Sequence, residues 1–250
     1  MRFIRKAVLL LPAMFFCCIT RVTYSQNNDT GGTDINKEFT SLEEALKNPQ
    51  DVYILNLSRQ HLKQVPAEIF SFTNLEVLNL SHNGLSELPP QIGTLEHLRV
   101  LNLSHNKLTE LPVETGQLET LSILNLSCNK LFSLPVTIGW LKNLSSLDAS
   151  RNKMTMIPST LGNLSKLKTL ILNQNLLTSL PSEIGNLQQL TYLDLWGNAI
   201  SVLPEEISKI SGTLKELDMR DMAINFDKQK HIQDLLPDTE IYFSKSCNCQ

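Results

Sequence analysis

Two sets of side chains in this sequence have types and spacings that could support chemistry. The first set is His82, His105 and Cys128, which follow one another at intervals of 23 residues, so we expect them at equivalent outward places on adjacent strands. Imidazole and thiolate groups are the ligands that zinc prefers. Arg59 and Arg151 take the equivalent places on either side, where their charges oppose a cation, and no fourth ligand is evident. We therefore expect no metal. The three residues remain a weak candidate for a zinc site. The alternative is that they simply occupy a variable position between a serine and an asparagine.

The second set combines aromatic, acidic and arginine side chains near the C-terminus. Its members alternate along two short segments, and they are Tyr192, Asp194 and Trp196, then Glu216, Asp218 and Arg220. On a strand, a spacing of two places side chains on the same face. Aromatic and arginine side chains are enriched at the centres of protein interfaces. We expect a partner-binding surface here, while the alternative is that these are ordinary solvated strand positions.

No pattern in the sequence indicates catalysis. We find no nucleophile beside a base at a recognisable spacing, no glycine-rich phosphate loop and no paired acids. The serines at intervals of 23 residues recur because the structure recurs. We expect a protein that is not an enzyme and that needs no cofactor.

The elements that position these side chains are repeats. A proline recurs every 23 residues, at Pro66, Pro89, Pro112, Pro135, Pro158, Pro181 and Pro204. An asparagine has the same period, at Asn83, Asn106, Asn129, Asn152, Asn175 and Asn198. We place seven repeats over 52–213 and a degenerate eighth from Leu214, in which Met222 replaces the asparagine. Repeats of this length indicate a solenoid.

Each part of the repeat has a physical role. The segment "LxL" alternates as a strand does, so its leucines point inward and neighbouring repeats pair into a parallel sheet. Where the chain leaves the sheet, backbone groups need new partners. The inward asparagine amide both donates and accepts hydrogen bonds, so we expect the six periodic asparagines to form a structural ladder. The proline that follows fixes φ and favours a return segment.

These residues resemble the leucine-rich repeat family in its 23-residue "LPxxIGxL" form, over about 52–224. The resemblance implies an α/β repeat solenoid, a curved horseshoe with a parallel concave β-sheet and short helical or irregular convex segments. It also implies protein recognition, mainly through the concave sheet. Intracellular Ras-pathway scaffolds and exported bacterial proteins share this form, and the opening "SLEEALKNPQDVYILNLS" is most similar to the exported bacterial group. The disulfide-bonded caps of animal extracellular members are absent from the sequence.

The sequence divides into five parts. Residues 1–25 have three early cations, an apolar stretch and small residues before Gln26, which is the layout of a secretory signal peptide. A polar leader follows over 26–37, and an N-terminal cap helix is expected over 38–51, where Ser41 and Glu44 fit a capping box. The repeats occupy 52–225. A C-terminal cap and tail occupy 226–250, with an amphipathic stretch before Pro237 and a short strand "EIYF".

The signal-like segment predicts a protein that is secreted or held at the cell surface or in the periplasm. Four Asn-X-Ser sequons lie on the expected concave face, where glycans would obstruct binding, and this favours bacterial export. The expected function is recognition of a host or cell-surface protein. The alternatives are an intracellular scaffold of the Ras-pathway type and a structural component of the cell envelope.

Charge and hydropathy exclude other classes of partner. The chain has 22 basic and 25 acidic residues, a net charge of −3, and four of the basic residues lie in 1–25. Nucleic-acid binders have a basic surface that neutralises phosphates, so we expect no nucleic acid. A membrane span needs roughly 20 consecutive apolar residues, and the sequence has no such run.

Overall fold

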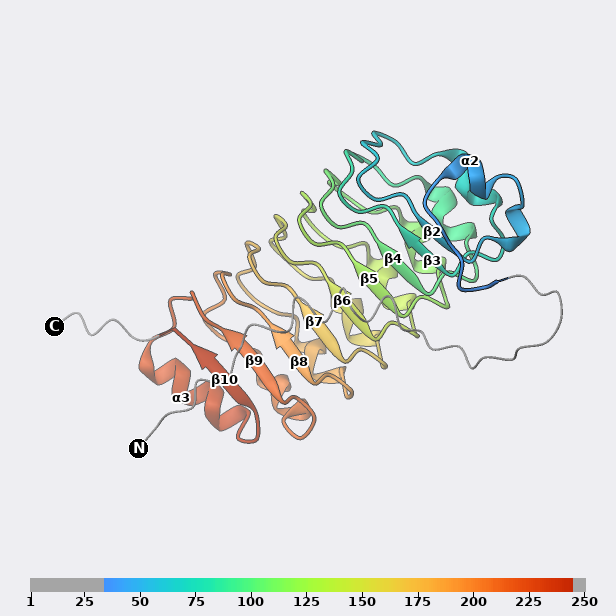
Figure 1. Ribbon diagram of the computed structural model, residues 1–250. Helices are drawn as coiled ribbons and strands as arrows, with labels where there is room; N and C mark the ends of the chain where they lie inside the picture. The colour runs from blue at the N-terminus through green and yellow to red at the C-terminus, as the bar shows by residue number, and fades with distance from the viewer. Residues whose placement is uncertain (1–33, 245–250) are drawn as a thin grey trace, which may run out of the picture. The chain divides into compact units, whose positions relative to one another are not determined.

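The computed structural model describes residues 34–244, which form a single parallel sheet whose ten strands lie side by side in chain order (Figure 1). The predicted signal peptide 1–25, most of the predicted leader 26–37, and Cys247 and Cys249 lie outside the described residues. No helix in 34–244 has the length and apolar character to cross a membrane.

The strands are short and spaced by one repeat. They are β1 Glu38–Phe39, β2 Ile54–Asn56, β3 Val77–Asn79, β4 Val100–Asn102, β5 Ile123–Asn125, β6 Ser146–Asp148, β7 Thr169–Ile171, β8 Tyr192–Asp194, β9 Glu216–Met219 and β10 Glu240–Phe243. Each residue pairs with its equivalent in the next repeat, as Leu101 pairs with Leu124. The central leucine of every repeat strand is fully buried, as Leu124 is in β5. This arrangement confirms the predicted repeat solenoid.

Return segments opposite the sheet are 3-10 helices, and each follows a repeat proline. They are η2 Ala67–Ser71, η3 Pro90–Thr94, η4 Val113–Gln117, η5 Val136–Trp140, η6 Ser159–Asn163, η7 Ser182–Asn186 and η8 Glu205–Ile210. The proline caps each helix in extended conformation, with φ of −65° at Pro135. Proline favours this place because its φ is fixed and it has no N–H to satisfy.

The periodic asparagines hold neighbouring repeats together. The side-chain amide of Asn129 donates to the carbonyl oxygens of Leu126 in its own repeat and Leu103 in the previous one, both at 3.0 Å. Its Oδ1 accepts from the backbone N–H of Leu108, also at 3.0 Å. Equivalent bonds are made by Asn83, Asn106, Asn152, Asn175 and Asn198.

One glycine in each inner return segment allows the repeats to approach closely. A Cβ built on Gly139 would lie 2.9 Å from the Cβ of Thr160 and would also contact the Thr160 carbonyl oxygen, in the next repeat. Gly116, Gly162 and Gly185 have the same relation to the repeat that follows them. The sequence pattern contained these glycines, but their packing role is visible only once the repeats are stacked.

The N-terminal end is covered by a strand as well as a helix. The prediction of a helix alone over 38–51 is incomplete, because Glu38 and Phe39 form β1 and pair with β2. The helix α2 (Leu42–Ala45) begins at Ser41, whose Oγ accepts from the N–H of Glu44 at 3.4 Å. A 3-10 turn, η1 (Pro49–Asp51), leads into the first repeat. Phe39 and Ala45 are buried, so this segment extends the core beyond the first repeat.

At the other end, α3 (Phe226–Leu235) packs beside η8 and β10 pairs with β9. Asn225 caps α3 by accepting from the N–H of Lys228 at 3.0 Å. Ile232 and Leu236 are buried against the core. The segment "EIYF" therefore adds a tenth strand, and its outward side chains extend the face formed by the repeats.

Candidate functional site

Outward-pointing side chains of the sheet form the face opposite the leucine core, which we call the outward face. The six residues singled out in the sequence lie at its C-terminal end. β8 supplies Tyr192 and Asp194, and Trp196 follows it in a turn. β9 supplies Glu216 and Asp218, and Arg220 follows it. We call these six residues the C-terminal patch.

The strand register brings the two halves of the C-terminal patch together. Tyr192 pairs with Glu216, and Asp194 pairs with Asp218. The spacing of two alone suggested that Trp196 belongs to β8, but the strand ends at Asp194. The reason is local, because the Asp194 Oδ1 accepts from the backbone N–H of Trp196 at 3.0 Å and closes a turn.

Arg220 is already paired within the C-terminal patch. Its Nε lies 3.0 Å from both carboxylate oxygens of Asp218, and its Nη2 lies 2.5 Å from Oδ2. The hydrogen bond to Asp218 and the charges of Asp218 and Asp194 raise the pKa of Arg220. The guanidinium also lies over the ring of Tyr242, at 6.0 Å from its centroid. Arg220 thus neutralises Asp218 and is held in place.

Asp194 has neutral hydrogen-bond partners instead of a cation. Its side chain accepts from the Asn173 amide at 2.6 Å and from the N–H of Trp196, and the residue is only 8% exposed. Burial raises the pKa of Asp194 to about 6, and the charge of Asp218 adds to the rise, while the two hydrogen bonds and the charge of Arg220 oppose it. The carboxyl is therefore ionised at neutral pH and loses its charge in mild acid.

The tyrosine of β8 experiences the same negative field. Burial raises the pKa of Tyr192, and the charges of Asp194, Asp218 and Glu216 raise it further. Its phenol stays protonated at any physiological pH. A protonated phenol donates a hydrogen bond, so Tyr192 offers a partner an aromatic ring and a polar tip.

β10 extends the C-terminal patch with side chains that the sequence analysis did not identify. Tyr242 pairs in register with Asp218, and Glu240 pairs with Glu216. Burial and a hydrogen bond with Glu240 raise the pKa of Tyr242 to about 12. The alternation within "EIYF" was the available signal, because it places Glu240 and Tyr242 on one face of the expected strand.

The N-terminal half of the outward face has a different character. Its asparagines Asn56, Asn79, Asn102 and Asn125 occupy the position of Asp194. Each Oδ1 accepts from the backbone N–H two residues later, at 3.0–3.1 Å. Asp194 and Asp218 accept the same bond, so the two halves differ in the charges and aromatic rings that they present and not in this bond.

The histidine and cysteine set lies beyond the strands. His82, His105 and Cys128 follow β3, β4 and β5, and all have positive φ, between 54° and 56°. The expectation that they lie on adjacent strands is therefore wrong, because the chain turns at this position through the left-handed region that Gly197 also occupies. Gly197 was the sequence signal for this turn.

The two histidine rings stack and do not converge. Their centroids are 4.1 Å apart and their planes differ by 10°. Burial lowers the pKa of both, and each is lowered further by a neighbouring positive charge, from His105 and Arg59 at His82 and from Arg151 and Arg59 at His105. Within 34–244, no three His, Cys, Asp or Glu side chains form a group that could hold a metal ion.

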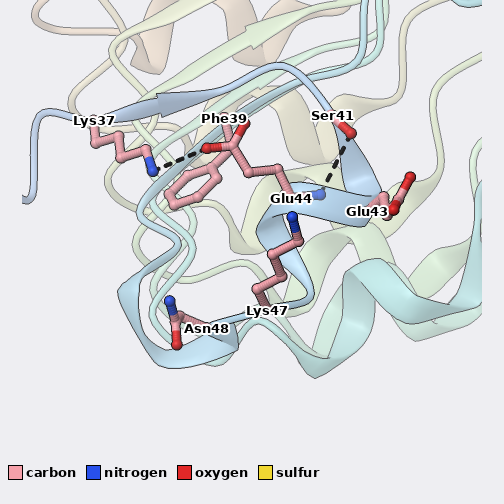
Figure 2. A pocket seen from close by; sticks show the side chains of 7 residues that line it. All are labelled: Lys37, Phe39, Ser41, Glu43, Glu44, Lys47 and Asn48. Carbon is pink, nitrogen blue, oxygen red and sulfur yellow. Dashed lines mark hydrogen bonds and ion pairs between the residues drawn. The ribbon is translucent and has the colours of Figure 1, made fainter.

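A hollow of about 370 Å³ lies at the N-terminal cap, and Figure 2 shows its lining side chains. Lys37 and Glu44 pair across it at 3.1 Å, and the Lys37 ammonium lies 4.3 Å from the ring centroid of Phe39. This cation and this acid are already paired, while Glu43 and Lys47 also line the hollow.

Models of known protein families match this chain over the same repeats. Three family models match: "Leucine-rich repeat region" over residues 90–174, "Leucine rich repeat" over 50–108, and "Leucine Rich repeats (2 copies)" over 165–212. No curated protein matches the chain.

Solved structures with the same architecture include bacterial and plant proteins. A leucine-rich repeat protein of Leptospira interrogans is 39% identical, with a TM-score of 0.76 over 83% of this chain and 54% of its own. An internalin of Listeria monocytogenes shares the fold at 24% identity, with a TM-score of 0.70 over 80% of this chain and 57% of its own. A plant peptide hormone receptor, solved in complex with RGF2, is 35% identical, with a TM-score of 0.58 over 68% of this chain and 28% of its own. The chain spans little more than half the length of the first two.

Proposed function

This chain belongs to the leucine-rich repeat family, and on that basis we propose that it is a binding module without catalytic activity that recognises another protein through the C-terminal patch. Leucine-rich repeat folds generally mediate protein–protein interaction. The observation that carries the proposal is the contrast between the two halves of the outward face. One half repeats neutral asparagines, whereas the other gathers aromatic and charged groups on adjacent strands.

The composition of the C-terminal patch is that of an interface centre. Tyr192 and Trp196 supply large rings that are partly exposed, and Arg220 is held by Asp218 in a fixed orientation. Aromatic and arginine anchors with few free rotamers contribute most to affinity because little entropy is lost when they bind. We further propose that the ligand is a host or cell-surface protein, which a pull-down from surface proteins with residues 26–250 would identify.

Replacing Trp196 with alanine is expected to weaken that complex by about 2 kcal/mol or more, because a central aromatic anchor is lost. The matched control is Asn79→Ala on the N-terminal half, which should change affinity little. Isothermal titration calorimetry of both variants with the captured partner checks this. A loss at Asn79 without a loss at Trp196 would place the binding surface at the other end of the sheet.

The location of the protein is a separate proposal, supported by the sequence of residues 1–25. We expect the chain to be exported and cleaved before Gln26, so that N-terminal sequencing of the protein from surface or secreted fractions starts near Gln26. An uncleaved chain found in the cytoplasm would instead favour the intracellular scaffold. Mature protein recovered only in complexes with itself would favour a structural envelope component.

A further inference from the structure

We propose that the C-terminal patch receives a basic side chain of the protein partner, arginine in preference to lysine, with Asp194 as its counter-ion. The inference rests on the proposed function and adds the chemistry of the group that is recognised. It is carried by three features of the outward face: the charge balance of β8–β10, the free hydrogen-bonding capacity of Asp194, and the two rings beside it.

The charge balance of this end of the sheet is strongly negative. Its outward positions hold one basic residue and four acidic ones: Arg220 against Asp194, Glu216, Asp218 and Glu240. The single base is already engaged, because Arg220 contacts both carboxylate oxygens of Asp218. The charge of Arg220 also acts on Asp194 and opposes the rise of its pKa, but among residues 34–244 no basic side chain forms an ion pair with Asp194. A partner's cation would fill that place.

Asp194 has unused hydrogen-bond acceptor sites for such a cation. One carboxylate oxygen accepts from the amide of Asn173 and the other from the N–H of Trp196. An ionised carboxylate offers roughly four acceptor sites, so each oxygen keeps one. Two free sites on one carboxylate match the parallel N–H groups of a guanidinium, whereas an ammonium is a point charge without that fork. This geometry favours arginine.

Rings lie on both sides of Asp194 along the chain. Tyr192 precedes it by two residues on β8, which is roughly 6.6 Å along an extended chain, and Trp196 follows it by two in the turn that the Asp194 carboxylate closes. A cation within about 6 Å of a ring centroid is attracted by the ring, and arginine also stacks on it. A guanidinium at Asp194 would contact both the charge and an aromatic surface.

The equivalent position two strands earlier, Asp148, shows that an acid flanked by two rings does not occur in every repeat. Asp148 in β6 also accepts from the backbone N–H two residues later, Ser150, at 3.0 Å. Its neighbours at the positions of the two rings are Ser146 and Ser150, and Arg151 follows directly. Asp148 is therefore a carboxylate without rings and beside a positive charge, which makes it a matched control.

The proposal can be tested with a small probe, because no partner has to be known. N-acetyl-arginine amide is titrated into residues 26–250 at constant ionic strength, and the indole N–H signal of Trp196 is followed by NMR, assigned with the Trp140→Phe variant. We expect a saturable shift. The lysine amide should bind more weakly, and the uncharged citrulline amide at least about fivefold more weakly, because a charge-assisted contact is lost. Equal binding of arginine and citrulline amides would overturn the proposal.

Two variants separate Asp194 from the general negative charge. Asp194→Asn should lower arginine-amide affinity at least about fivefold by removing the counter-ion, while Asp148→Asn should leave it unchanged. The fold tolerates the first change, because asparagine holds this position in β2–β5. Unchanged binding in Asp194→Asn would contradict the inference. If the captured protein partner is lost by Trp196→Ala but not by Asp194→Asn, the proposed function stands and this inference fails.

Acid provides an independent readout. The groups facing Asp194 are Asn173 on the β7 side, Asp218, Glu216 and Arg220 on the β9 side, and Tyr192 on its own strand. Because its pKa is raised to about 6, the arginine amide should bind more weakly at pH 5 than at pH 7.5. That difference should shrink in Asp194→Asn. A pH dependence of equal size in both proteins would assign the effect to other acids and overturn the role of Asp194.

Discussion

Replacing Asn129 with leucine is expected to lower the free energy of unfolding by about 3 kcal/mol. The backbone N–H of Leu108 loses its partner, the Asn129 Oδ1, and a buried unpaired donor costs roughly 1–3 kcal/mol. The carbonyls of Leu103 and Leu126 each keep one amide, from Asn106 and Asn152. They therefore lose only a second bond, worth about 0.5–1.5 kcal/mol each.

Urea unfolding followed by circular dichroism measures this loss. The matched control is Met222→Leu, at the equivalent position of the last repeat, where the asparagine is already absent and the side chain is buried. Leucine and methionine have similar volumes, so the control should be nearly neutral. Equal shifts in the two variants would mean that the asparagine bonds between repeats contribute nothing to stability.

Gly139→Ala is expected to destabilise the protein by about 3 kcal/mol, at the upper end of the cost of overpacking. The new methyl group would lie 2.9 Å from the Cβ of Thr160 and closer still to its carbonyl oxygen. Backbone of the next repeat cannot move aside as a flexible side chain can. The Thr160 Oγ1 is in addition bonded to the carbonyl of Val136 at 2.7 Å, so a shift there also disturbs the contact between η5 and η6.

Thermal and urea unfolding of this variant is compared with that of Gly212→Ala. Gly212 has no atom within 4 Å of a built Cβ, so alanine should be neutral or slightly stabilising there. If the two variants are equally stable, the close approach of the return segments does not exclude a side chain at Gly139. If Gly139→Ala is destabilised selectively, the glycine of "LPxxIGxL" is explained by steric contact between repeats.

Much of the fold could be predicted because its determinants are local and recur. The "LxL" segments specify strands by their period of two, and the proline specifies where the return begins. The ladder asparagines could be assigned an inward, bridging role from the backbone groups that a turn leaves unpaired. Each of these predictions needs only the sequence of one repeat and the observation that this repeat recurs along the chain.

Details that involve two repeats were less accessible. The turn after each strand was misread as part of the strand, since His82 and His105 have side chains that tolerate either conformation, and only Gly197 signalled positive φ. The role of Gly139 depends on the distance between return segments, which the sequence does not contain. The cap strand β1 has only two residues, too few to show a period.

The sequence by itself determined that a parallel repeat sheet exists and that aromatic and charged residues gather at its C-terminal end, because period and register follow from spacing. Only the tertiary structure decided what these residues do to one another. It paired Arg220 with Asp218, left Asp194 with neutral donors, and brought Tyr242 beside them from β10. The physical reason is that charge pairing and the pKa of a carboxyl depend on burial and on distances of a few ångströms between strands, which depend on side-chain rotamers and packing.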